Sequence, residues 1–121
     1  LATTESTVPW STIMIRKSFG VAAAAHYGPD GYVLAWPSAE SGPLPLEGGV
    51  AVAFKKEIAS AENPEAKRKE LEEKMAKNQN PFPRAEAFSV HEIIDPRETR
   101  KYIALWAERI QSQLRAKLVS R

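Results

Sequence analysis

The sequence predicts an α/β fold in a single domain over residues 1–121. Two short apolar runs, at residues 12–17 and 32–36, are each followed by turn-forming residues and then by a helix-forming segment. The chain ends in a long stretch with apolar residues at helical spacing. Alternation of strand-like and helix-like segments is typical of α/β proteins.

The first strand–turn–helix unit begins with β-branched and apolar residues at 12–17, which favour a strand that Gly20 ends. The alanines that follow have high helix propensity, and we expect His26 to finish this helix near the negative end of its dipole. A Gly-Pro-Asp-Gly sequence predicts a turn at residues 27–31. The second strand is then predicted at residues 32–36.

The middle of the chain changes from irregular to helical. Pro43 and Pro45 cannot both lie inside a helix, so residues 37–49 are expected to be irregular at least in part. Residues 48–59 favour a helix over a strand. Asn63 is a suitable N-cap with Pro64 at the first helical position, and the charged residues 65–77 predict a largely solvated helix.

The C-terminal part predicts a turn and a short strand within residues 80–94, followed by a long helix. Asp95 can cap this helix, Pro96 can start it, and Glu98 lies three residues after the cap, as in a capping box. One apolar stripe runs along the predicted helix through Tyr102, Ile103, Trp106, Ile110, Leu114 and Leu118.

The composition excludes several classes of protein. The chain has 121 residues, a formal net charge of +2 and no cysteine. Without cysteine there is no disulfide framework, thiolate metal site or cysteine nucleophile, which fits a reducing, cytoplasmic compartment. The cations are dispersed among carboxylates, so we expect no nucleic-acid partner. No run approaches the roughly 20 apolar residues that span a bilayer, so we expect no membrane partner.

The small residues after Gly20 allow two interpretations. The alanines can pack a helix closely against a sheet, and the residues taken alone favour this. Alternatively, the first N–H groups of the helix have no intrahelical partner, so a carbonyl or oxyanion could approach the amides of Val21 and Ala22.

Four stretches in order resemble one protein family. They are Arg16 to Ala22, Ala35 to Glu40, Asn80-Pro81, and Asp95 to Arg100. In this order and spacing the chain resembles the C-terminal half of the carboxyltransferase (beta) subunit of biotin-dependent acyl-CoA carboxylases, of the acetyl-CoA or propionyl-CoA type. The resemblance extends over about residues 8–114. The chain begins with Leu1, and we expect it to belong to a longer reading frame.

The resemblance implies a partial crotonase-like (ClpP-like) fold of repeated ββα turns. It also implies transfer of a carboxyl group from carboxybiotin to the α-carbon of an acyl-CoA thioester, with biotin attached to a separate carrier. The implied partners are the N-terminal half of the same subunit, a biotin carboxyl carrier or biotin carboxylase subunit, and further copies in a homo-oligomer. The acyl-CoA is held mainly by the N-terminal half, so the 121 residues alone are expected to be inactive.

The same resemblance implies the site residues. The amides of Val21 and Ala22 would form an oxyanion hole for the ureido oxygen of biotin. Phe19, Gly20, Ala23 and Ala24 would lie against the cofactor. No metal site is implied. A backbone site of this kind explains glycine and alanine at these positions in place of catalytic side chains.

Three departures from the family pattern affect this site. Val21 stands where the family usually has glycine, and Ala23 where tyrosine is common. Leu44-Pro45 replaces a methionine-glycine pair, whereas Glu47 agrees with the family. Each position keeps a main-chain amide except Pro45, so we expect changes in pocket shape, acyl-chain preference or activity.

Other side chains are weaker candidates for chemistry. His26 and His91 are far apart in the sequence, without carboxylates at metal-ligand spacing. Ser38, Glu40 and Ser41 lack the G-x-S-x-G elbow of a serine nucleophile. The basic residues Arg97, Arg100 and Lys101 are expected to form structural ion pairs rather than to bind CoA phosphates.

Two alternatives to the carboxylase remain. The same fold could act in the reverse direction, as a subunit of a biotin-dependent acyl-CoA decarboxylase. The chain could also be a non-catalytic α/β interaction domain that binds a partner through apolar faces.

Overall fold

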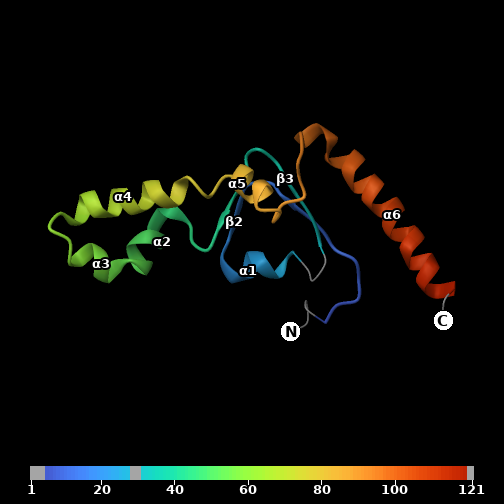
Figure 1. The fold of residues 1–121 in the computed structure, drawn as a ribbon, viewed down its shortest axis with the longest axis horizontal. Helices are drawn as coiled ribbons and strands as arrows, with labels where there is room; N and C mark the ends of the chain where they lie inside the picture. The colour runs from blue at the N-terminus through green and yellow to red at the C-terminus, as the bar shows by residue number, and fades with distance from the viewer. Residues whose placement is uncertain (1–4, 28–30, 120–121) are drawn as a thin grey trace.

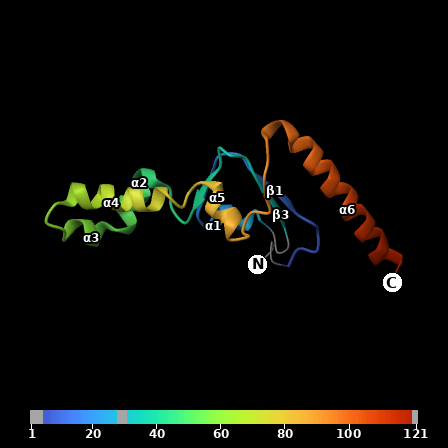
Figure 2. The ribbon, with the colours of Figure 1, turned by 45° about the horizontal axis from the view of Figure 1, so that its top comes forward.

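The computed structural model describes residues 5–27 and 31–119 and confirms the α/β class (Figure 1). The middle of the turn predicted at residues 27–31 lies outside the described residues. Five strands and a first short helix form the centre of the described molecule. Further helices extend to either end of its long axis (Figures 1 and 2).

The strands form two small parallel sheets. The larger sheet has the order β1-β3-β5, and the smaller one pairs β2 with β4. Their bounds are β1 (Ser11–Met14), β2 (Lys17–Phe19), β3 (Tyr32–Ala35), β4 (Glu40–Gly42) and β5 (Glu92–Ile93). The register places Ile13 opposite Leu34 and Phe19 opposite Gly42. Parallel neighbours require crossover connections, so each sheet joins segments that are distant in sequence.

The prediction of one strand at residues 12–17 is wrong, because the chain bends after Met14 and forms two strands. The Met14 carbonyl accepts a hydrogen bond from the Trp36 amide at 2.9 Å, and the Arg16 carbonyl accepts one from the Glu40 amide at 2.8 Å. The segments on either side of the bend thus pair in different sheets. The second of them pairs with β4, which lies inside the stretch predicted to be partly irregular.

Helices α1 (Gly20–Ala25) and α4 (Pro64–Ala76) confirm two predicted helices, whereas the single helix predicted at residues 48–59 is divided at Phe54 into α2 (Leu46–Ala53) and α3 (Lys55–Ala59). The Asn63 side chain caps α4 by accepting a hydrogen bond from the Ala66 amide at 3.1 Å. Leu71 is the buried residue of α4, as expected for a largely solvated helix. Helices α2, α3 and α4 lie side by side at one end of the molecule (Figures 1 and 2).

The prediction of only a turn and a strand within residues 80–94 is also wrong. Helix α5 (Pro81–Glu86) precedes β5, and Asn80 caps it by accepting a hydrogen bond from the Phe82 amide at 3.1 Å. The helix is allowed because Pro81 and Pro83 occupy its first turn, where amide groups need no intrahelical acceptor.

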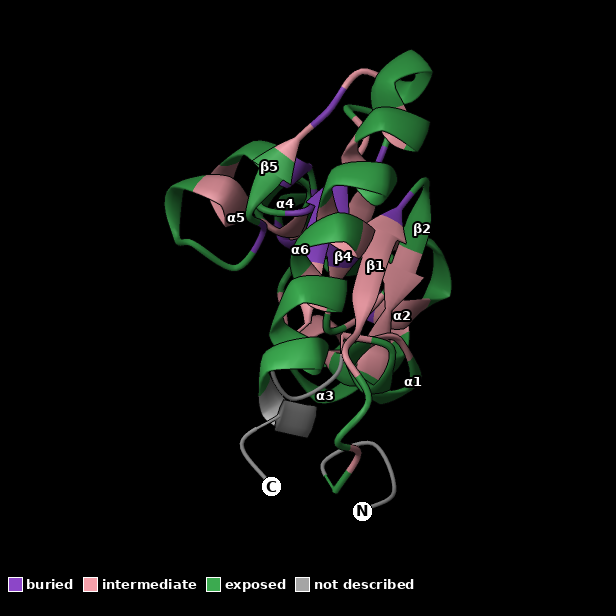
Figure 3. Cartoon of the chain, turned by 90° about the vertical axis from the view of Figure 1, so that its right-hand side faces the viewer, coloured by how far each residue is buried: buried purple, intermediate pink, exposed green. Residues whose placement is uncertain are grey.

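The long C-terminal helix is confirmed, with a different first turn. Residues Pro96–Glu98 form the 3-10 turn η1, and α6 (Thr99–Val119) follows. The Asp95 side chain accepts a hydrogen bond from the Arg97 amide rather than from Glu98. From this turn α6 extends away from the sheets (Figure 1), and most of its described surface is exposed (Figure 3).

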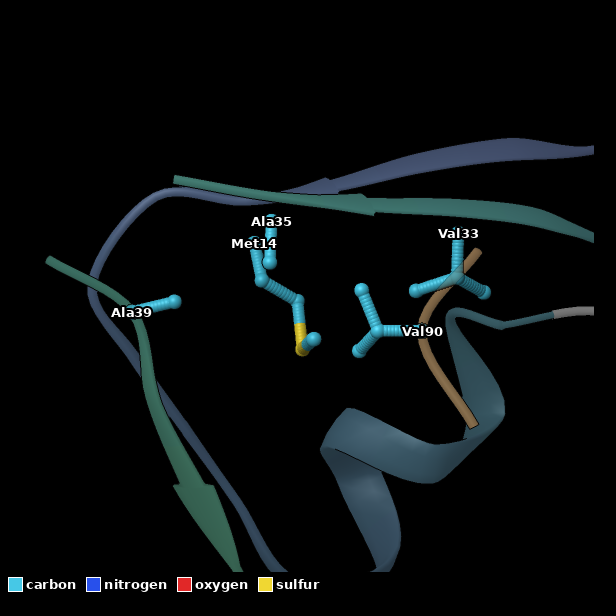
Figure 4. Close-up of a cluster of buried hydrophobic side chains, with 5 residues drawn as sticks. All are labelled: Met14, Val33, Ala35, Ala39 and Val90. Carbon is cyan, nitrogen blue, oxygen red and sulfur yellow. The ribbon is translucent and has the colours of Figure 1, made fainter. Parts of the chain in front are cut away.

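The core lies against the larger sheet. Its buried members are Met14, Val33, Ala35, Ala39 and Val90 (Figure 4). They come from β1, from β3, and from the segments that precede β4 and β5, so the core brings segments that are distant in sequence into contact. Within the described residues, no helix is long and apolar enough to cross a membrane.

Candidate active site

The predicted site lies where β2 passes into α1. Gly20 is the first residue of α1 and has a φ of +75°, a conformation that favours glycine. The preceding residue, Phe19, is paired with Gly42 of the neighbouring parallel strand. Because β2 and β4 are parallel and end together, the residues that follow both strands meet at one edge of the smaller sheet.

The amides of Val21 and Ala22 are in the first turn of α1. First-turn amides have no acceptor inside their own helix. The N-cap position, Phe19, gives no side-chain hydrogen bond, and within the described chain neither amide donates to a turn or loop carbonyl. The Val21 side chain is 88% exposed, so it points away from the protein. Both N–H groups are therefore available to an acceptor from outside this chain.

The other predicted site residues contribute shape rather than charge. The Phe19 ring packs on Gly42, with its Cδ1 atom 3.8 Å from where a Cβ of Gly42 would stand. The carbonyls of Ala23 and Ala24 accept the amides of His26 and Tyr27, at 3.1 and 3.2 Å, which ends the helix. The fold therefore brings these residues together around one short turn.

A cavity of about 480 Å³ opens beside the end of β4 and the residue that follows it. Ser41, Gly42 and Pro43 form one wall. The other lining residues are Met75, Asn78, Gln79, Pro83, Arg84, Ala87 and Ser89. The amides of Val21 and Ala22 do not line this cavity, but the Pro43 carbonyl connects the two places, since it lies 3.8 Å from where a Cβ of Gly20 would stand.

Two buried polar residues in this cavity were not predicted from the sequence. Ser41 is 1% exposed, and within the described residues its hydroxyl has no hydrogen-bond partner. Gln79 is 6% exposed and donates from its side-chain nitrogen to the Leu44 carbonyl at 2.9 Å. A serine and a glutamine outside any motif carry no local signal of burial, so sequence reasoning had no means of finding them.

The departures from the family pattern lie around the same edge. Pro45 takes the N-cap position of α2 in an extended conformation, and Gly48 has a φ of +80° at a kink inside that helix. Lys17 on β2 forms an ion pair with Glu47 on α2 at 3.5 Å. Glu47 of α2 therefore contacts β2 through an exposed ion pair.

The histidines and the basic cluster have structural contacts. The His26 carbonyl accepts the Thr12 hydroxyl at 2.5 Å. The Nδ1 atom of His91 accepts the Val33 amide at 3.1 Å, and its ring packs on Tyr32 with a centroid separation of 5.2 Å. Arg97 pairs with Asp95 at 2.6 Å, as expected for a structural ion pair. No group of three or more potential metal ligands occurs in the described residues.

Two tyrosines near the C-terminal helix have perturbed acidity. Burial, together with a hydrogen bond of 2.6 Å to the Glu92 carboxylate, raises the pKa of Tyr32 to about 12. The Glu92 carboxylate also raises the pKa of Tyr102 on α6. Both phenols lie on the larger sheet and α6, away from Gly20, so they belong to the structural part of the molecule.

The family of the chain follows from a comparison with family models. Residues 1–121 match the model of the carboxyl transferase domain. The chain therefore belongs to the carboxyl transferase family, which confirms the resemblance to a carboxyltransferase subunit.

Three relatives show the range of this family. The chain is 39% identical over 107 residues to the methylmalonyl-CoA carboxyltransferase 12S subunit of Propionibacterium freudenreichii subsp. shermanii, covering 85% of this chain and 20% of that protein. It is 36% identical over 104 residues to the propionyl-CoA carboxylase carboxyltransferase subunit of Haloferax mediterranei, covering 82% and 20%. It is 36% identical over 107 residues to the methylmalonyl-CoA decarboxylase subunit alpha of Propionigenium modestum, covering 84% and 20%. The chain thus spans about a fifth of the length of these relatives.

A solved structure confirms the fold. The transcarboxylase 12S hexamer, crystallised with methylmalonyl-coenzyme A and methylmalonic acid, superposes with a TM-score of 0.75 at 37% identity. The superposition covers 92% of this chain and 22% of that one. The expected partial crotonase-like fold is therefore present.

Proposed function

We propose that this chain forms the biotin-facing part of a carboxyltransferase subunit and takes part in carboxyl transfer from carboxybiotin to the α-carbon of an acyl-CoA thioester. The observation that carries the proposal is the turn at Gly20. There a positive φ places two amides, those of Val21 and Ala22, at an exposed helix start where neither has a turn or loop acceptor among the described residues. Family membership supplies the reaction class.

The residues at this turn fit the ureido group of biotin. The acceptor is a carbonyl-type oxygen, and main-chain N–H groups are its natural donors. The first turn of α1 has no acidic residue that would repel a developing oxyanion. The side chains beyond Val21 are alanines, which leave room for a ring to approach the backbone.

When bound, carboxybiotin supplies the carboxyl group and, after losing it, a ring nitrogen able to accept a proton. The role of this chain is to hold the ureido oxygen. The amides of Val21 and Ala22 donate to that oxygen as it gains negative charge, and they need no proton transfer of their own. Losing one donor of this kind typically costs about 3–4 kcal/mol of transition-state stabilisation.

The complete subunit is required for activity under this proposal. The chain spans about a fifth of its relatives, and we assign the binding of the acyl-CoA thioester to the remainder. The partners are that remainder, a biotinylated carrier with its biotin carboxylase, and further copies of the subunit in a cytoplasmic oligomer. The 121 residues alone should not turn over acyl-CoA.

The direction of the reaction has a second candidate. Similarity to a methylmalonyl-CoA decarboxylase subunit supports the reverse reaction, in which biotin accepts the carboxyl group. The oxyanion site has the same task in both directions. Carboxyl exchange measured from propionyl-CoA and from methylmalonyl-CoA would separate them, because the decarboxylase should process only the second at a useful rate.

The proposal can be tested by deleting one donor. Val21→Pro removes the amide hydrogen at the second helical position of α1, where proline is tolerated. In the complete subunit with a biotinylated carrier, we expect kcat to fall by about 10²–10³-fold.

Glu65→Pro is the matched control, because Glu65 holds the second helical position of α4, outside the site. It should retain wild-type kcat, and circular dichroism should show both variants folded. Equal activity of the two variants would reject the oxyanion site and favour an interaction domain. Carboxyl transfer by the 121-residue chain alone would reject the assignment of acyl-CoA binding to the rest of the subunit.

A further inference from the structure

Gln79 is a buried polar residue between α4 and α5, and it contacts both ends of residues 41–44, a segment made of the last two residues of β4 and the two residues after it. Its carbonyl accepts the Ser41 amide at 2.8 Å. Its side-chain nitrogen donates to the Leu44 carbonyl at 2.9 Å. One residue therefore fixes residues 41–44 at two points, from a position 35 residues later in the sequence than Leu44.

This segment in turn supports the Gly20 turn. Gly42 is paired with Phe19, the residue before Gly20. The Gln79 Cγ atom and the Phe19 ring are both 3.8 Å from where a Cβ of Gly42 would stand. Because Gly42 has no side chain, both groups can lie close to its backbone. The Pro43 carbonyl is at the same distance from the corresponding point of Gly20. Gln79 thus contacts residues 41–44, and these lie beside the Gly20 turn because Gly42 is paired with Phe19.

We infer that Gln79 is a positioning residue, which holds residues 41–44 against Gly20 and thereby sets the direction of the Val21 and Ala22 amides. This inference rests on the proposed function. Among the described residues, Gln79 supplies the one side-chain hydrogen bond to residues 41–45. Proline at position 45 has no amide hydrogen to donate, so Gln79 is the side chain that holds the Leu44 end of residues 41–44, while pairing with β2 holds the other end.

The chemistry of the glutamine amide suggests the variant to use. Gln79→Glu keeps the shape of the side chain but replaces the nitrogen donor with a carboxylate oxygen, which repels the Leu44 carbonyl. Protonation restores a donor, because a neutral carboxyl group carries one O–H. Burial raises the pKa of a carboxyl group, so this recovery should fall within an accessible pH range.

The experiment uses the complete subunit, a biotinylated carrier and propionyl-CoA. For Q79E at neutral pH we expect kcat to fall about tenfold or more, since small displacements of reacting groups have large effects on rate. The KM for propionyl-CoA should stay within about twofold. The ratio of Q79E to wild-type kcat should rise as the pH falls. Q111E, at an exposed glutamine of α6, is the control and should match the wild type at every pH.

A purely structural role would give a different result. Equal kcat for Q79E and Q111E, or a loss of kcat that does not recover at lower pH, would overturn the inference. Gln79→Met guards against misfolding, because it keeps the length of the side chain without charge or donor. Folded Q79M should also show reduced kcat, and full activity would overturn the inference.

The two proposals can fail separately. If the wild-type subunit transfers no carboxyl group, the proposed function fails. In that case, the amide NMR shifts of residues 20–22 in Q79M still test the positioning role. Shifts that differ from the wild type would support it, and unchanged shifts would overturn it.

Discussion

The sheets at the centre of the molecule and the helices at its ends are stabilised in different ways. The centre contains fully buried side chains such as Leu34 and Ala35 in β3 and Ser41 in β4, and parallel partners distant in sequence hold the strands in register. Helix α6 has Ile103, Leu105 and Leu114 all at least 40% exposed. The colouring of Figure 3 shows this contrast, with buried residues in and around the strands and exposed ones along the helices.

This difference shows which region is stabilised by apolar contacts within the chain itself. Burial of apolar surface is the dominant favourable contribution to folding. The sheet region obtains it within the chain, because residues before β4 and β5 pack onto β1 and β3. The end helices obtain less, since α2 and α4 each bury one apolar side chain and α3 buries none. Substitutions should therefore have very different effects in the two regions.

The largest difference is expected between two leucines. Leu34 in β3 has no exposed surface, whereas Leu105 in α6 is 42% exposed. Leu34→Ala should lower the free energy of unfolding by about 2–5 kcal/mol, because it removes buried methyl groups and leaves a cavity. Leu105→Ala should lower it by about 0.5 kcal/mol or less. Urea titrations of the two variants, followed by circular dichroism, measure both values, and equal losses would break the comparison.

Two glycines with positive φ allow the two regions to be compared by their effect on activity. Gly20 starts α1 beside the smaller sheet, and Gly48 lies at the kink of α2. Alanine at either position should cost about 1–2 kcal/mol of stability, because a side chain is strained in this conformation. Only Gly20→Ala should lower kcat of the complete subunit, by about tenfold or more, since it redirects the site amides.

The surroundings of the two glycines explain this expectation. Among the described residues, a Cβ at position 20 would be in ordinary contact with the Pro43 carbonyl at 3.8 Å, whereas no atom lies within 4 Å of one at position 48. Carboxyl-transfer kinetics and thermal unfolding of both variants provide the measurement. A similar fall in kcat for G48A would mean that general destabilisation, rather than the geometry of the turn, controls activity.

Local sequence signals predicted the elements whose partners are nearby in the chain. The Asn63-Pro64 pair correctly predicted the start of α4. The same Asn-Pro signal recurs at Asn80, where a further proline made a turn seem the better interpretation, although prolines are tolerated in a first helical turn. The split of residues 12–17 could not be predicted, because it depends on which distant strand pairs with each half.

In the candidate site too, the sequence predicted the local feature and missed the long-range one. The turn at Gly20 was found because glycine and alanine follow a strand within a few residues, and because the surrounding motifs resemble a family. Gln79 was missed because both of its partners precede it by more than thirty positions and no motif marks it. Residues that act through long-range contacts of this kind are identified from a three-dimensional structure, not from sequence motifs.

The smallest predicted effect concerns pH and compares one tyrosine from each region. The pKa of Tyr32 in β3 is raised to about 12 by burial and by its hydrogen bond to Glu92. The folded state therefore keeps a proton that the unfolded state releases near pH 10. The stability that this provides is fully present below pH 10 and is lost as the pH rises towards about 12.

Relative to Tyr32→Phe, the wild type should lose stability over that range. Tyr102→Phe on exposed α6 should change the pH profile less. Urea unfolding between pH 8 and pH 12 measures both, and a larger effect at Tyr102 would show that α6 is more firmly held than the sheets.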